Sequence, residues 1–486
     1  MKILKNLIFI FLLVGVVFSC NEDDFLNEQP ISNESVHSYF QNSNEFELAV
    51  NGVYAALRGI TSDYPILSEM RSDNSTYQFN DVNRSIHWFW LLDGFEMSTL
   101  NTIPNRHWDA CYAGIGRCNA VLHYIEDQEI ENKDRYIAEV KFIRAFTYFS
   151  LLRYFGNIPL ITSKVETYSE AFELNQQVSK DLVYEQIIAD LNDAKENLPK
   201  SYSGEDGRAT EGAARTLLGK VLMWQGRYGD AASELETVIN SQQYSLLDDY
   251  SLVFDINNEN NEEIIFSIQN IEGPYGLSSN YMYRYIPWNS EKKYISHGAD
   301  IASGGLNIPT EDLLNSFEMG DKRKSMIDTS FIDSERYVYH DSIVPFTKKY
   351  MDPDHAIQGQ TGVNMPIFRY PHVLLMLAEC YEREGGGDPL PLVNQVRQRA
   401  GLSELSDVTI NNIIHERRVE FNCECDRWDV LVRTGIAMEV MKTHAEKERE
   451  RPDITASSFS NIKLLYPIPD IQISLDPKLK QNPEYQ

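Results

Sequence analysis

Positive charge is scarce in this chain of 486 residues, where 44 Lys and Arg stand against 72 Asp and Glu and leave a formal net charge of −28. Such a chain repels phosphate polyanions and anionic lipid, so we expect no nucleic-acid binding and no charge-driven membrane contact. The HExxH, GxSxG and P-loop patterns are missing, and His87, His107 and His123 lack the spacing of metal ligands. The sequence therefore has no recognised signature of an enzyme active site, and no metal or cofactor is predicted.

Cysteine is scarce too. The chain has six, with no CxxC pair, so neither a disulfide framework nor a zinc site is predicted. Cys111 and Cys118 lie seven residues apart on a helical pattern, which is typical of small buried apolar side chains. Calcium stays open, because an acidic loop such as Asp352-Pro353-Asp354 would suit it, although no loop has the spacing of an EF-hand.

Long apolar runs are missing beyond the N-terminus. The single run, from Leu7 to Phe18, follows a basic start (MKILK) and is shorter than the ~20 residues that span a bilayer. It is followed by Ser19-Cys20, so residues 1–19 are predicted to be a signal peptide that is cut before Cys20. Lipidation of Cys20 would then anchor the mature chain to a membrane. A plain secretory signal with an incidental cysteine is the alternative.

The rest of the chain reads as mostly helical. An acidic, polar tether is predicted at 20–42, a helical part at 43–243, and a mixed part at 244–486 that includes a strand at 262–269. Apolar residues at helical spacing start at Ser43 and recur through most of the chain. Further helices are predicted at 105–126, 132–155, 178–197, 210–225, 228–241, 369–384, 389–400, 407–421 and 426–447. From Leu464 onward, repeated prolines favour an extended tail.

One segment has the pattern of a tetratricopeptide repeat. In 218–238, the small residues Gly219 and Ala231 would let two antiparallel helices approach closely, with Tyr228 over the turn. Other helix pairs could stack in the same way and form an α-solenoid scaffold. An ordinary helical hairpin is the alternative. The predicted fold class is thus mostly α, with tetratricopeptide-like helix pairs and a loop-rich face with short strands.

Several motifs occur together in one order. They are EFELAVNGVYAAL (45–57), WDACYAGIGRCNAVL (108–122), AEVKFIRAFTYFSLLRYFGNIPLI (138–161), GRATEGAARTLLGKVLMWQG (207–226), FRYPHVLLMLAECYEREGG (368–386), HERRVEFNCECDRWDVLVRTG (415–435) and LYPIPDIQI (465–473). In this set and order, the chain resembles the SusD/RagB family of outer-membrane nutrient-uptake lipoproteins. It departs from the family near Arg427, where Glu424-Cys425 stands in place of the usual Glu-Gly and Asp429 lies one place early. The departure leaves the local turn open.

The resemblance implies a function in binding and gating. A SusD-like protein sits as a lid on a SusC-like TonB-dependent β-barrel transporter in the outer membrane, faces the cell exterior, and captures an oligo- or polysaccharide for import. Two alternatives stay open. One is the same lid role with peptide or another non-glycan cargo, and the other is a repeat scaffold that binds no nutrient.

Sugar recognition needs flat aromatic faces together with side chains that hydrogen-bond hydroxyl groups. Trp88 and Trp90 would lie on the same face of one extended strand, and Tyr281, Tyr283 and Tyr285 would lie on the same face of a second strand. For each aromatic, core packing is the alternative. The candidate ligand residues are Arg71, Asp73, Asn74, Tyr77, Asn83, Trp88, Trp90, Asn101, Tyr283, Tyr285 and Trp288. By contrast, Trp108, Trp224 and Trp428 are expected in the core, and Arg144, Arg215, Arg397, Arg417 and Arg418 in structural pairs.

Overall fold

Polar side chains cap the N-terminal ends of helices in the first half of the chain. The side chain of Asn42 accepts a hydrogen bond from the backbone of Glu45 at the start of α3, and Thr210 does the same for Ala213 at the start of α9. The computed structural model describes residues 39–78, 87–296, 304–333, 342–449, 451, 454–455 and 457–486. Cys20 and Asn83 lie outside these ranges.

The helices expected from the sequence are present. They are α3 (Ser43–Thr61), α5 (Thr102–Ile125), α6 (Lys133–Phe155), α8 (Lys180–Asn197), α9 (Glu211–Trp224), α10 (Tyr228–Asn240), α14 (Tyr370–Glu384), α15 (Leu390–Arg399) and α16 (Ile410–Glu420). Shorter α-helices are α4 (His87–Asp93), α7 (Tyr168–Leu174), α11 (Met282–Tyr285), α12 (Glu291–Tyr294), α13 (Glu311–Ser316) and α19 (Asp470–Leu475). The 3-10 turns are η3 (Tyr250–Phe254), η4 (Ile256–Asn258), η5 (Lys322–Met326) and η6 (Pro483–Tyr485). A π-helical turn is present at η1 (Pro65–Glu69).

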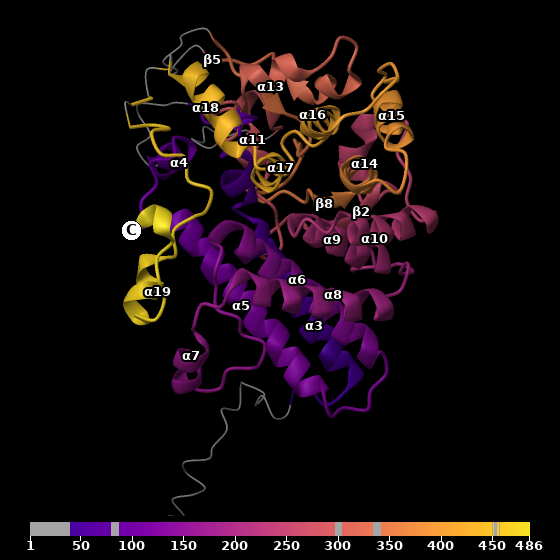
Figure 1. Ribbon diagram of the computed structural model, residues 1–486, viewed down its shortest axis with the longest axis vertical. Coiled ribbons are helices and arrows are strands. Elements are labelled where there is room, and N and C mark those ends of the chain that lie inside the picture. Colours follow the sequence, from indigo (N-terminus) through magenta and orange to yellow (C-terminus); the bar gives the residue numbers. More distant parts are fainter. Residues whose placement is uncertain are drawn as a thin grey trace, which may run out of the picture.

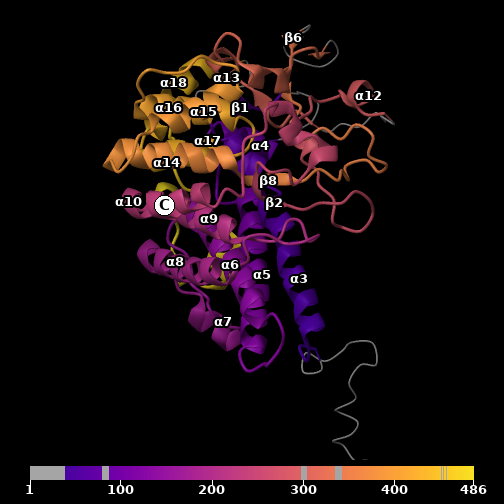
Figure 2. The ribbon, with the colours of Figure 1, turned by 90° about the vertical axis from the view of Figure 1, so that its right-hand side faces the viewer.

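The helices stack in layers along the molecule. In Figure 2, α8, the α9–α10 pair, α14 and the α15–α16 pair follow one another from the lower to the upper part. The close approach predicted for α9 and α10 is present, because a Cβ placed on Gly219 would lie 2.9 Å from Leu235 Cδ2, and Ala231 is fully buried. The mostly helical fold class and the tetratricopeptide-like hairpin are therefore confirmed.

Short strands join segments that are far apart in the sequence. All pairs are antiparallel: β1 (Ser75–Thr76) with β3 (Ile308–Pro309), β2 (Ile264–Ile268) with β8 (Met365–Arg369), β4 (Ile327–Asp328) with β7 (Phe346–Thr347), and β5 (Ile332–Asp333) with β6 (Ser342–Ile343). The β2–β8 pair places the expected strand at 262–269 against the start of α14. It thereby fixes the helical layers to the loop-rich part (Figure 1).

Four expectations about local structure are wrong. Trp88 and Trp90 lie in helix α4, and Tyr283 and Tyr285 in helix α11, so neither pair lines a strand. The helix expected at 426–447 is divided into α17 (Arg427–Thr434) and α18 (Ala437–Glu448), because Gly435 adopts a left-handed conformation with φ +80° that ends α17. The tail is not fully extended, since it contains α19. In the two aromatic segments and the tail, short helices form where apolar alternation and prolines predicted extended chain, whereas at 426–447 the glycine divides a helix that was expected to be continuous.

The residues expected in the core and in structural pairs mostly take those roles. Trp108, Trp428, Cys111 and Cys118 are buried, whereas Trp224 is only partly buried. Ion pairs join all five arginines to acidic partners: Arg144 to Asp190, Arg215 to Glu211 and Glu234, Arg397 to Glu318 and Glu416, Arg417 to Asp426, and Arg418 to Asp73 and Asp312. Within the described part of the chain, no helix is both long and apolar enough to span a bilayer.

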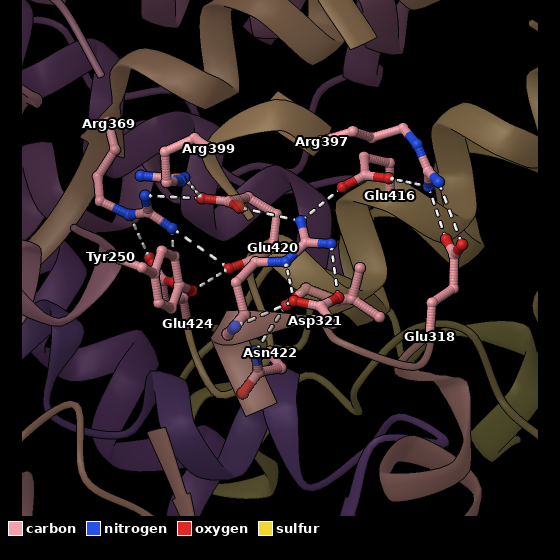
Figure 3. Close-up of polar contacts among 12 residues, drawn as sticks. Tyr250, Glu318, Asp321, Arg369, Arg397, Arg399, Glu416, Glu420, Asn422 and Glu424 are labelled. Atoms are coloured by element: carbon pink, nitrogen blue, oxygen red, sulfur yellow. Dashed lines mark hydrogen bonds and ion pairs between the residues drawn. The ribbon is translucent and has the colours of Figure 1, made fainter. Parts of the chain in front are cut away.

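A buried charge network binds the C-terminal layers together (Figure 3). Its centre is Glu420 on α16, which accepts hydrogen bonds from Arg323, Arg369 and Arg399 at 3.1, 3.0 and 2.6 Å. The three arginines come from η5, the end of β8 and the end of α15. Their charges are shared with neighbouring acids, among them Glu263, which accepts from both Arg369 and Arg399. One carboxylate thus holds together segments that are up to about a hundred residues apart.

The turn after α16 contains Cys425, the residue that stands where the family pattern usually has glycine. Cys423 and Cys425 both have left-handed backbones, with φ +61° and +64°. Their backbone N–H groups donate to the two oxygens of the Glu69 carboxylate, each at 2.9 Å. Burial raises the pKa of Glu69 to about 7 despite these bonds. A glycine at 425 would take this conformation without steric cost, whereas a cysteine takes it under strain.

We therefore expect Cys425→Gly to be more stable than Cys425→Ala by about 1 kcal/mol, although glycine fills less space. Both variants remove the thiol, so their difference isolates the backbone conformation. Urea unfolding midpoints at pH 7 measure it. An alanine variant as stable as the glycine variant would mean that this turn relaxes out of the left-handed conformation.

Candidate functional site

The loop-rich face brings the two predicted aromatic sets together. It is formed by β1 and β3, α4, α11 and α12, which lie in the upper part of Figure 2. The backbone of Gln78, just after β1, donates to the carbonyl of Gly305, and the Gln78 side chain accepts from the backbone N–H of Trp288, both at 2.7 Å. We call Tyr77, Trp88, Trp90 and Trp288 the aromatic cluster.

Ring packing and charge fix the position of Tyr77 in this cluster. Its ring stacks on Trp90 with 5.9 Å between centroids and an interplanar angle of 21°. The guanidinium of Arg451 lies 4.9 Å from the centre of the Tyr77 ring, and Asp93 lies 3.8 Å from Arg451. Trp88 and Trp90 are partly buried, and Trp288 is 7% exposed. Tyr77 is itself only 2% exposed, so Trp88 and Trp90 are the two rings of the cluster that leave surface on which a ligand can stack.

The helical conformation of α4 changes how its two tryptophans can act. Residues two apart in a helix point in different directions, so Trp88 and Trp90 do not form one flat platform. Asn101 has a structural role here. Its side chain caps α5 through Ile103 and donates to the carbonyl of Trp88 at 3.1 Å. Asn101 thus supports α4 from below and is itself fully buried.

Arg71, Asp73 and Asn74 lie inside the protein. The Arg71 guanidinium packs against the rings of Phe95, Trp428 and Tyr466 and donates to backbone carbonyls of the C-terminal tail. Asp73 forms a bidentate pair with Arg427 at 2.7 and 2.8 Å. Burial opposes ionisation of Asp73, but Arg427 and Arg418 outweigh it and hold its pKa well below the usual range.

Asn74 completes this inner set. Its amide donates to Glu69 and accepts from Arg418, at 3.4 and 2.8 Å. The three residues therefore connect the segment after η1 to the C-terminal layers. The side chains of Arg71, Asp73 and Asn74 bond to other protein groups and thereby hold the loop-rich face to the interior of the protein.

The two tyrosines of α11 point to different neighbours. Tyr283 shares a hydrogen bond of 2.7 Å with His355 Nε2, and Tyr285 stacks on Tyr350 at 5.0 Å. Both are buried. The structure thus joins Tyr77 to Trp90 by stacking and to Trp288 through the neighbouring Gln78, and leaves Tyr283 and Tyr285 in separate buried packing.

Sequence reasoning missed two residues that help to form this face, Gln78 and Arg451, and one exposed ring in the loop between β2 and α11, Tyr275. Gln78 joins the two aromatic sets and directly follows Tyr77, so the same stretch could have indicated it. Arg451 lies far along the chain, and no local signal marks it. Tyr275 is 71% exposed at the tip of the turn GPYG, where Gly273 and Gly276 have positive φ. A Pro-Gly turn around an aromatic residue would have predicted an exposed ring.

This site can bind, through stacking and hydrogen bonds, a ligand that has both apolar faces and hydroxyl groups. Among the described residues, no group of three or more His, Cys, Asp or Glu could hold a metal ion. The acidic loop considered for calcium bonds to protein groups instead: Asp352 accepts from the backbone of Gly362 at 3.2 Å and Asp354 accepts from Ser296.

Comparisons with known proteins agree with this chemistry. Residues 333–485 match the family model described as "SusD family", and residues 24–223 match the model described as "Starch-binding associating with outer membrane". SusD-like protein P25 of Formosa agariphila is 26% identical, over 98% of this chain and 97% of its own. The starch-binding protein SusD of Bacteroides thetaiotaomicron is 25% identical, over 72% of each chain.

The fold has solved counterparts. A laminarin-binding SusD-like protein superimposes with a TM-score of 0.76 at 25% identity, covering 91% of this chain and 99% of its own. None of these descriptions names a reaction. The resemblance drawn from the motifs is confirmed, and the chain belongs to the SusD/RagB family.

Proposed function

We propose that this protein is an outer-membrane surface lipoprotein that binds an oligo- or polysaccharide at the aromatic cluster. It would pass this cargo, as a lid, to a SusC-like TonB-dependent β-barrel transporter. The observation that carries the proposal is the partly exposed ring of Trp90, which is held in place by stacking on the buried ring of Tyr77, because a fixed aromatic face suits the apolar faces of sugars. The names of relatives that bind starch and laminarin support the same class of ligand.

An exposed apolar surface supports the presence of a protein partner. On α7, Tyr168 and Phe172 are 90% and 48% exposed, and on α19, Ile471 and Leu475 are 58% and 61% exposed. The segment just after α19 is joined to α7, since Lys478 donates to the carbonyl of Phe172 at 2.9 Å. Each helix offers an i, i+4 apolar pair to solvent. Such grouped exposure is typical of a protein–protein contact.

Removing the tryptophans tests the glycan site. We expect Trp88→Ala and Trp90→Ala to weaken retention by one polysaccharide about 10- to 100-fold, as truncation of a ring at a binding hot spot does. Affinity electrophoresis against a panel that includes laminarin and starch gives the measurement. Tyr168→Ala is the matched control, because it removes an exposed ring far along the chain and should leave retention unchanged.

The alternatives predict other outcomes. Retardation by no glycan, together with tight binding of oligopeptides, would favour a lid with peptide cargo. Binding of neither, with stable assembly on a barrel, would favour a scaffold. Thermal unfolding midpoints of the two tryptophan variants must stay near that of the wild type, since Trp90 also packs on Tyr77.

A further inference from the structure

Three adjoining hollows lie on the helical side of the protein, away from the aromatic cluster. The first, of about 340 Å³, is bounded by α3, the turn at 205–208 and the end of β2. The second, of about 210 Å³, lies across the same turn, and the third, also of about 210 Å³, continues from Lys200 and Tyr244 along α9 and α10. We call them together the helical groove. In Figure 2, α3 and β2 lie below α4 and α12.

Hydroxyl and amide side chains are the largest group in the lining of the helical groove, which also includes the acids Glu205, Asp206, Glu211 and Glu262. Tyr54 and Gln269 line the first hollow, Tyr202 and Asn260 the second, and Tyr244 both the second and the third. Tyrosine rings give apolar walls with polar edges, and amides can donate and accept hydrogen bonds at once. Within a protein of this charge, such a lining suits a ligand that is rich in hydroxyl groups. Its first hollow alone has the volume of a small-molecule site.

The walls of the groove are fixed by their own contacts. The backbone N–H of Ala209 donates to the Tyr54 hydroxyl, and the hydroxyls of Thr210 and Tyr244 share a hydrogen bond, each at 2.9 Å. Gly212 lets Tyr244 lie close, because a Cβ there would be 2.6 Å from the tyrosine oxygen. Gln269 accepts from the Asn260 amide at 2.9 Å. Walls that are ordered in advance spare a ligand the entropic cost of arranging them.

Two cations that line the groove, Arg58 and Lys200, have no acidic partner among the described residues. Arg208 is surrounded by Glu47, Glu139 and Glu205. By contrast, Arg58, in the last turn of α3, makes no ion pair or hydrogen bond to any described residue, and its Nε atom is buried. Burial lowers the pKa of Arg58, with no acid to offset it. A guanidinium in this state gains from an anionic group brought by a ligand.

We propose that the helical groove is a second binding site, for an oligosaccharide segment whose anionic substituent, a carboxylate or a sulfate ester, pairs with Arg58. The site shares no residue with the aromatic cluster. It rests on the proposed function only for the class of ligand. Two separate sites would let the protein hold a long acidic polysaccharide at two points along its length, which raises the apparent affinity without any new kind of contact.

Titration calorimetry of the mature chain tests this with three probes: hexagalacturonate, a sulfated carrageenan hexasaccharide and neutral laminarihexaose. Ala55→Trp fills the first hollow from α3, and Arg58→Gln removes the charge while keeping an unbranched polar side chain that can donate hydrogen bonds. We expect each to weaken binding of at least one anionic probe tenfold or more. Ala171→Trp on α7 is the matched control for the added ring, and should change affinity less than twofold.

Binding at the helical groove can be tested separately from binding at the aromatic cluster. A Trp88→Ala, Trp90→Ala double variant should keep the anionic binding that Ala55→Trp removes, and should lose laminarihexaose if the proposed function holds. The stronger of the two anionic probes identifies the substituent. Failure of both anionic probes to bind, equal binding by Ala55→Trp and wild type, or loss of that binding in the double tryptophan variant would each overturn the second site.

Discussion

Replacing Glu420 by glutamine should lower the free energy of unfolding by about 3–5 kcal/mol, which is the usual cost of leaving buried charges without a partner. Glu420 accepts from Arg323, Arg369 and Arg399, and all four side chains are nearly or fully buried. Figure 3 labels Glu420 together with Arg369 and Arg399. Glutamine keeps the shape but removes the charge, and its amide would point donors at guanidinium groups that are themselves donors. Three cations from three segments would then be held by the remaining acids alone.

Urea unfolding at pH 7 measures this effect. Asp230→Asn is the matched control, because Asp230 forms an exposed i, i+3 pair with Arg227, and exposed pairs contribute only about 0–1 kcal/mol. A loss below about 1 kcal/mol for Glu420→Gln would show that Glu263, Glu416 and Glu424 compensate for it, so that the network tolerates the removal of its centre.

The pH dependence of stability gives an independent check. Burial opposes ionisation of Glu420, but Arg399, Arg369 and Arg323 outweigh it and hold its pKa well below the usual range. Its contribution is therefore fully present above the unfolded pKa of about 4.3 and is lost as the pH falls toward the folded value. Wild type should lose stability below about pH 4, and Glu420→Gln should lose less over the same interval.

Two other buried acids, Glu69 and Glu139, change stability with pH in the direction opposite to Glu420. Burial raises the pKa of Glu69 and that of Glu139, each to about 7. Since the folded state then binds more protons than the unfolded state between about pH 4.5 and 7, stability should fall as the pH rises through that interval. The contributions of Glu69 and Glu139 therefore weaken stability as the pH rises toward 7, whereas that of Glu420 weakens it as the pH falls below about 4.

The helical layers could be predicted because each helix carries its own signals. The caps at Asn42 and Thr210 and the apolar spacing in α3 are local, and so is the Gly219–Ala231 pattern that brings α9 and α10 together. Such features need no knowledge of distant residues. The same holds for the family motifs, which consist mainly of these local patterns and of the buried residues that follow them.

The binding face could be predicted only in part, because distant segments form it. The stretch around Tyr77 and the segment ending at Trp288 each indicated aromatic recognition, but their meeting depends on Gln78 and Gly305. Arg71 and Asp73 look like ligand residues in the sequence. They are buried because their partners, Tyr466 and Arg427, come from the last third of the chain. Long-range pairing decides whether a polar side chain faces a ligand or a neighbour.

Removing the proposed lipid anchor should have the other large effect. We expect Cys20→Ala, expressed behind a conventional cleavable signal, to move the protein from the membrane fraction into the soluble fraction almost completely. Each buried CH₂ of an acyl chain contributes about 0.8 kcal/mol to membrane binding, so the loss of several chains removes far more than any surface contact supplies. The described part of the chain offers no spanning helix as a substitute. Quantitative blotting of the fractions measures the change.

The same variant separates the anchor from the other proposed contacts. Retention by polysaccharide gels should equal that of wild type, because the aromatic cluster lies in the folded part and takes nothing from Cys20. Loss of retention would give the anchor a role in binding. Persistence of Cys20→Ala on membranes would instead indicate a protein contact strong enough to hold it, and Tyr168 and Leu475 on the exposed apolar surface are where a substitution should then release it.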